Sequence, residues 1–195
     1  MLYPKFYDEV EKIEITDELS EILGAFKDGK IEFSYLDIVK SAGHSCPTVA
    51  GAYLMLKDGL KRFNNPKRGE LKAYLKDDIS EGVTGVISNI ISQVIGSTSK
   101  SGFHGLAGKY DRRGLMYFNA DISSSMRLID RDGKVVDIDY DPSKLLPNPK
   151  MNPLMQKVLS NGATKEEKKE FQDLWQERVE KILTSPNVVI TIKIA

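Results

Sequence analysis

Apolar side chains recur at helical spacing in two segments near the middle of the chain. The first segment follows Pro47, and the apolar residues on one of its faces are Val49, Tyr53, Leu56 and Leu60. The second segment ends at Gly96, and its apolar residues are Val83, Val86, Ile87, Ile90, Ile91 and Val94. Spacings of three and four residues put side chains on one helix face, so the pattern predicts two amphipathic helices.

Alternation of apolar and polar residues predicts the strands of a sheet. Between the two helices the alternating residues are Leu71, Ala73 and Leu75 on one face and Lys72, Tyr74 and Lys76 on the other. This period of two is typical of a half-buried strand. Further strands are expected over 115–121, 125–131 and 134–140, with Asp132-Gly133 as the hairpin turn between the last two.

Shorter elements are expected before Pro47. A short helix capped near Thr16 should end at Gly24, and residues 31–33 suit a brief strand. Ser34 is a good cap for a further helix that Gly43 would stop.

The last quarter of the chain is expected to be mainly helical. The segment 141–153 contains four prolines and indicates a connector. Thr164 and Glu167 predict a capping box that opens a long helix, and the apolar stripe around Trp175 should pack against a core or an interface. Residues 187–195 favour a final strand.

Together these elements predict a two-layer α+β fold, with helices on one face of a largely antiparallel or mixed sheet. We expect an α+β core domain over 1–146, and a C-terminal helical extension over 147–195 that ends in a strand.

Composition narrows the function classes. Lys+Arg and Asp+Glu balance at 28 each, and the pI near 6.8 argues against a nucleic-acid binder. A single cysteine excludes an internal disulfide framework. The start of the chain resembles no signal peptide, and no run approaches the ~18 apolar residues of a membrane span. We therefore expect a cytoplasmic protein that is not bound to a membrane.

The stretch AGHSCPTVAG, residues 42–51, holds the only cysteine and one of the two histidines. A lone cysteine is often just a small buried side chain. Here Pro47 favours a helix start and makes Cys46 the expected N-cap, where unpaired N–H groups favour the thiolate. If the preceding backbone is extended, His44 and Cys46 project to one side. Such a pair can bind a metal ion or act as a base and a nucleophile.

A zinc site needs more donors than these two, because Zn²⁺ binds four ligands. The acidic segment KDDISEGVTG offers Glu81 and Asp78, with Asp77 less favoured, and water can fill an open position. The alternative for Glu81 is that a carboxylate simply favours the start of a helix. His104 is a further candidate, although an exposed loop histidine is more often only solvated.

The segment 97–113 is rich in glycine, serine and basic residues. It lacks the Walker pattern, and the chain contains no G-x-S-x-G motif. Its basic residues would suit a small anionic substrate, whereas the alternative is a mobile surface loop. These residues are Lys100, Lys109, Arg112 and Arg113.

On the residues His44-Ser45-Cys46-Pro47, followed by a helix, a strand, a second helix and a glycine-rich loop, the chain resembles the E-type formylmethanofuran dehydrogenase family. The likeness extends over about residues 31–146, and GHSCPTVAGAYLM is its most specific part. The resemblance implies an α+β fold related to a domain of glyceraldehyde-phosphate dehydrogenases. It also implies a homodimer and a transition metal, usually zinc, with His44 and Cys46 as ligands.

The chain departs from the family pattern at several points. Many members read H-G-H-x-C-P-G, where this chain has Ala42 and Thr48, and many carry a further cysteine and a C-terminal four-cysteine ribbon that are absent here. In this divergent branch the remaining ligand would be Glu81, Asp78, His104 or water. We expect a zinc-binding protein with an open coordination position, and leave enzymatic activity open. The alternatives are a metal-free thiol enzyme using Cys46 and His44, or a non-catalytic accessory protein.

Overall fold

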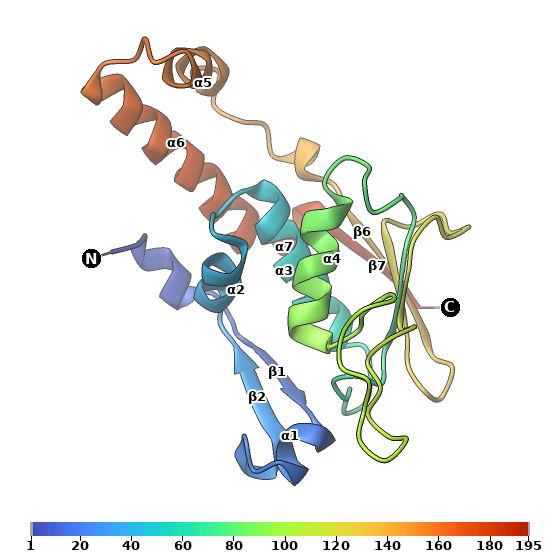
Figure 1. Cartoon of the computed structure of the whole chain (residues 1–195). Coiled ribbons are helices and arrows are strands. Elements are labelled where there is room, and N and C mark those ends of the chain that lie inside the picture. The colour runs from blue at the N-terminus through green and yellow to red at the C-terminus, as the bar shows by residue number, and fades with distance from the viewer. Residues whose placement is uncertain (1, 195) are drawn as a thin grey trace.

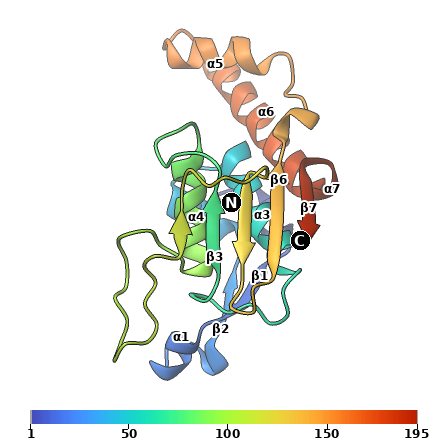
Figure 2. The ribbon, with the colours of Figure 1, turned by 90° about the vertical axis from the view of Figure 1, so that its right-hand side faces the viewer.

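The main sheet of the computed structural model, which describes residues 2–194, has its strands in the order β4-β3-β5-β6-β7 (Figure 2). Their bounds are Met116–Tyr117 (β4), Lys72–Leu75 (β3), Met126–Ile129 (β5), Val135–Tyr140 (β6) and Ile190–Ile194 (β7). The β3–β4 pair is parallel and the other neighbouring pairs are antiparallel. The predicted mixed, largely antiparallel sheet is confirmed.

Two helices, α3 (Pro47–Leu60) and α4 (Thr84–Ile95), cover one face of this sheet. In Figure 2 the strands lie in front of both helices, which makes the two-layer α+β arrangement visible. Figure 1 shows that α3 and α4 run in the same direction, so their N-termini lie at one end of the molecule and their C-termini at the other. We call these the amino end and the carboxyl end of the helix pair.

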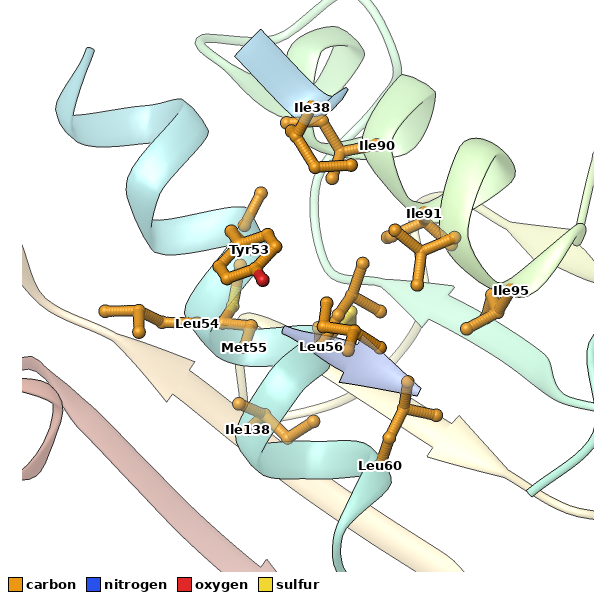
Figure 3. Close-up of a cluster of buried hydrophobic side chains, with 14 of the residues drawn as sticks. Ile38, Tyr53, Leu54, Met55, Leu56, Leu60, Ile90, Ile91, Ile95 and Ile138 are labelled. Carbon is orange, nitrogen blue, oxygen red and sulfur yellow. The ribbon is translucent and has the colours of Figure 1, made fainter. Parts of the chain in front are cut away.

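The core fills the space between the helix pair and the sheet. Figure 3 shows side chains of α3, α4 and β6 meeting there, and Tyr53, Leu56, Ile91 and Ile138 are fully buried. Each such side chain contributes roughly 1.5–3 kcal/mol through burial. The sheet approaches α3 most closely at its glycines: a Cβ built on Gly59 would lie 2.4 Å from the Cδ1 of Ile138.

Local signals explain where the early helices begin and end. α2 (Tyr35–Ala42) starts with a capping box between Ser34 and Asp37, and ends at Gly43, whose φ of 74° is the left-handed conformation that glycine adopts freely. α1 (Glu18–Ile22) is capped by Asp17, which accepts hydrogen bonds from the next turn. These assignments follow the sequence predictions closely.

Two predictions about strands were wrong in detail. The sequence reading missed β1 (Ile13–Thr16), which pairs antiparallel with β2 (Lys30–Phe33) in a separate two-stranded ribbon. The strand predicted over 115–121 shortens to β4, because Asn119 has a left-handed φ of 54° and turns the chain away.

The C-terminal segment leaves the core and returns to it. Its helices are α5 (Met151–Leu159), α6 (Lys165–Thr184) and α7 (Pro186–Val189). The capping box of Thr164 and Glu167 is present as predicted, and Val179 and Ile182 of α6 are fully buried. In Figure 1, α5 and the first half of α6 project from the body. β7 then joins the main sheet beside β6; the final residue of the predicted strand, Ala195, lies outside the described residues.

Short 3-10 turns complete the described elements, at Lys5–Glu9 (η1), Lys27–Gly29 (η2) and Pro142–Lys144 (η3). Across residues 2–194, no helix has both the length and the apolar character needed to span a bilayer.

Candidate functional site

Cys46 is the N-cap of α3, as its position before a proline predicts. Its backbone is extended (φ −148°, ψ 169°), and Pro47 occupies the first helical position. The Sγ atom accepts a hydrogen bond from the N–H of Val49 at 3.4 Å. The sulfur therefore sits where unpaired N–H groups and the helix dipole favour a negative charge.

His44 lies beside this cap on the molecular surface. Its Nδ1 is 2.9 Å from the carbonyl oxygen of Ala42, so the tautomer protonated at Nδ1 donates there and leaves Nε2 as a free donor atom for a ligand bond. His44 is exposed, Ser45 is buried and Cys46 is half-buried. In an extended segment this alternation turns Ser45 inward and places His44 and Cys46 on the outer side.

Ser45 anchors the motif to two other elements. Its hydroxyl lies 2.9 Å from the hydroxyl of Tyr35 in α2, and its carbonyl oxygen accepts a hydrogen bond from the Nε1 of Trp175 in α6 at 2.8 Å. The packing role predicted for the Trp175 stripe is thus confirmed, but the hydrogen bond to the motif was not foreseen. Tyr35 is fully buried, and this burial raises the pKa of its phenol.

Tyr140 of β6 supports the first turn of α3 from the sheet side. Its hydroxyl donates to the carbonyl oxygen of Pro47 at 2.6 Å, and its ring lies against Gly51, where an added Cβ would come within 2.2 Å of it. Burial raises the pKa of Tyr140, although the charge of Arg178 acts in the opposite direction. The phenol therefore stays protonated at neutral pH and acts as a hydrogen-bond donor.

The predicted acidic ligands lie in the loop that leads into α4, and their hydrogen bonds are made within that loop and to Asn119. The carboxylate of Glu81 accepts from the backbone N–H of Asp78 at 3.2 Å. Asp78 accepts from the N–H and hydroxyl of Ser80 and from Asn119, and these hydrogen bonds hold the pKa of Asp78 below its usual value.

Across the residues that the structure describes, no group of three or more His, Cys, Asp or Glu side chains is placed to hold a metal ion. The structure thus brings His44 and Cys46 together without a third donor. The assignment of Glu81 as a ligand stays a prediction.

His104 lies far from this motif along the fold. The loop 97–113 that carries it follows the C-terminus of α4, so it lies at the carboxyl end of the helix pair, whereas Cys46 lies at the amino end (Figure 1). The loop is fastened there by backbone hydrogen bonds, such as Thr98 to Arg112 at 2.9 Å. The structure therefore does not bring His104 or the basic loop residues to Cys46.

The donor set fits part of a transition-metal site. A histidine Nε2 and a half-buried thiolate are donors that Zn²⁺ takes in proteins. The contact of Nδ1 with a backbone carbonyl is the kind of supporting bond that orients such a histidine. Two coordination positions are thus provided by His44 and Cys46, and the others would come from water or from groups brought to the motif.

Comparison with known families gives a match over most of the chain. The family model described as "FmdE, Molybdenum formylmethanofuran dehydrogenase operon" matches residues 42–191. The matched region is more than half of the chain; it starts just before His44 and ends within β7. A search of curated proteins finds no match.

Proposed function

The chain belongs to the FmdE family, and on this premise we propose that it is a transition-metal-binding protein that holds zinc through His44 and Cys46. We propose further that its role is related to formylmethanofuran dehydrogenase, which the family description names. Catalysis by the bound metal is left open.

The observation that carries the proposal is the cap geometry of Cys46. A metal ligand must be a thiolate, and the Val49 N–H and the positive end of α3 both favour that form. His44 faces the same side with Nε2 free of the backbone contact. A serine or an aspartate would cap the helix equally well, so helix stability alone does not require cysteine here.

The remaining ligands come from one of two sources in this proposal. The loop of Glu81 lies at the amino end of the helix pair, and releasing its hydrogen bond to the Asp78 N–H would free the carboxylate. Alternatively, a second copy of the chain brings donors to the motif, in line with the homodimer that the family resemblance implies. A water in a position left open would be activated or displaced by substrate, as in other open zinc sites.

The test is elemental analysis of protein purified without chelator or histidine tag. We expect about one zinc per chain in the wild type, and loss of metal in the Cys46→Ser and His44→Ala variants. Because serine is itself a preferred N-cap, Cys46→Ser should keep α3 intact, and circular dichroism checks this. His104→Ala is the matched control, and it should retain the metal.

Two outcomes would overturn the metal assignment. One is wild-type protein free of metal even after incubation with zinc. The other is full metal content in both site variants. A Glu81→Gln variant then decides the third ligand: weakened zinc affinity supports Glu81, and unchanged affinity supports water or a second copy.

A metal-free thiol enzyme is the second candidate, and the absence of a third donor side chain among the described residues favours it. Cys46 would be the nucleophile and His44 the base. This function predicts alkylation of Cys46 by iodoacetamide that is fast at neutral pH, unaffected by added zinc and slowed in His44→Ala. Protection of Cys46 by zinc would favour the metal site instead.

A further inference from the structure

A hollow of about 520 Å³ opens at the carboxyl end of the helix pair, where the loop 97–113 meets the start of β3. Its volume is in the range of small-molecule sites. Five basic and three acidic residues line it, in a chain whose formal net charge is zero. The basic residues are Arg68, Lys72, Lys109, Arg112 and Arg131, and the acidic residues are Glu18, Glu70 and Asp111.

The lining carboxylates already have partners. The ion pairs are Glu18 with Lys67, Glu70 with Arg131, and Asp111 with Arg113. Within residues 2–194, neither Lys72 nor Lys109 forms an ion pair of this kind. Their two ammonium groups therefore give the rim of the hollow a positive charge that is not neutralised by a paired carboxylate.

Beneath the rim, two guanidinium groups share one buried carboxylate. Arg112 donates to Asp17 at 2.7 Å and Arg68 donates to its other oxygen at 3.0 Å. Asp17 and Arg112 are 3% and 5% exposed. The Nε atoms of Arg68 and Arg112 are buried and have no hydrogen-bond partner among the described residues.

Two cations against one anion leave a net positive charge in a partly buried setting. Such a charge is unfavourable unless an anion compensates it. Buried polar atoms without partners are rare in native proteins, so the two Nε atoms also call for an explanation. A negatively charged ligand in the hollow would offset the charge of both arginines.

We propose that this hollow is a binding site for a small molecule that carries phosphate or carboxylate groups. Lys72 and Lys109 contact the anionic oxygens as mobile point charges. Arg68 and Arg112 supply a fixed positive field from below, since their hydrogen bonds to Asp17 hold them in place. The site lies at the opposite end of the helix pair from Cys46, so it does not depend on metal binding there (Figure 1).

The test is isothermal titration of the full chain with inorganic phosphate and, separately, with citrate. Ionic strength is held constant with sodium chloride so that screening does not change. The site variant is Lys72→Gln with Lys109→Gln, which removes both rim charges and leaves the Asp17 network intact. The matched control is Lys100→Gln, which makes the same kind of charge change in the same loop but outside the lining of the hollow.

We expect saturable binding of at least one probe by the wild type and by Lys100→Gln. The dissociation constant should rise about tenfold or more in the double variant, since charged hydrogen bonds to the anion are lost with both lysines. Binding of phosphate alone identifies a phosphate ligand, and binding of citrate alone identifies a carboxylate ligand. Both results support the proposal.

The proposal is overturned if neither probe binds saturably, or if the double variant and Lys100→Gln bind as tightly as the wild type. Cys46→Ser serves as a further control, and it should bind the anion normally even where it has lost zinc. Failure of the metal assignment and failure of the anion site are thereby distinguished.

Discussion

The two ends of the α3–α4 pair hold their side chains in different ways. At the amino end, neutral side chains bond to backbone carbonyls: Trp175 to Ser45 and Tyr140 to Pro47. At the carboxyl end, charged side chains bond to one another through the buried carboxylate of Asp17. The first arrangement leaves the reactive groups half-exposed, whereas the second fixes charge inside the molecule.

Both arrangements follow the polarity of the helices. Cys46 places an electron-rich sulfur at the positive N-terminus of α3. Arg68 donates to the carbonyl oxygen of Gln93 in the last turn of α4, where the helix dipole is negative. Electron-rich donors therefore gather at one end of the pair and cations at the other, and each end suits a different ligand.

The largest difference between the ends should appear on neutralising Asp17. In Asp17→Asn, two guanidinium groups lose their only shared carboxylate, and breaking a buried pair costs about 3 kcal/mol or more of unfolding free energy. Asparagine keeps an oxygen that can cap α1, so the loss reports the charge. Urea denaturation measures the effect.

The control is Asp173→Asn, because the ion pair of Asp173 with Lys169 is mostly exposed. It should cost less than about 0.5 kcal/mol. A loss below about 1 kcal/mol for Asp17→Asn would contradict the view that the carboxyl end depends on buried charge.

The same carboxylate predicts a pH dependence. Burial raises the pKa of Asp17, but the hydrogen bond from Arg68 and the charge of Arg112 outweigh burial and hold the pKa below its usual value. A lowered folded-state pKa gives stability that is fully present above the unfolded value of ~3.9 and is lost as pH falls through the folded value. The stability gap between the wild type and Asp17→Asn should therefore be constant above about pH 5 and shrink below about pH 4. A gap that stays constant as the pH falls to about 3 would contradict this assignment.

How far the sequence predicts each end depends on how local its contacts are. The cap at Cys46, the stop at Gly43 and the capping box at Thr164 involve residues within a few positions, and the sequence predicted all three. By contrast, Asp17 and Arg112 are 95 positions apart, and Ser45 and Trp175 are 130 apart. No local pattern encodes such pairs, because the topology of the sheet decides which segments meet.

The strand β1 was missed for a related reason. Ile13 and Ile15 alternate with polar residues over only four positions, which is too short a signal by itself. The strand forms because β2, after an intervening helix, supplies its hydrogen-bond partners. Single donors such as Glu81 are equally undecided by sequence, because a carboxylate before a helix suits both a cap and a ligand.

A change of intermediate size is expected at Gly51, which sharpens the account of the amino end. In Gly51→Ala the new Cβ would lie 2.2 Å from the Tyr140 ring, so the ring must move, at a cost of about 2 kcal/mol. Helix propensity alone would favour alanine by ~1 kcal/mol, so a net loss of stability in urea denaturation reports the clash. Gly85→Ala is the control, since its nearest atom lies at 3.3 Å. A smaller loss in a Tyr140→Leu background would support this cause, and an unchanged loss would argue against it.

The smallest expected effect is that of Trp175→Phe, which keeps an aromatic ring but removes the hydrogen bond to Ser45. We expect about 1 kcal/mol of lost stability, the usual net value of one such bond. Phe171→Leu is the control on the same helix, because Phe171 packs on Trp175 without reaching the motif by a hydrogen bond.

The comparison of the two ends gives this variant a second readout. If α6 positions the backbone between His44 and Cys46, Trp175→Phe should weaken zinc binding severalfold, because ligand geometry loosens when its support is removed. Anion binding at the carboxyl end should stay unchanged, since the ion pairs of Asp17 involve no residue of α6. Equal loss at both ends would mean that Trp175 stabilises the whole fold; loss at the amino end alone would identify it as a positioning residue for the motif.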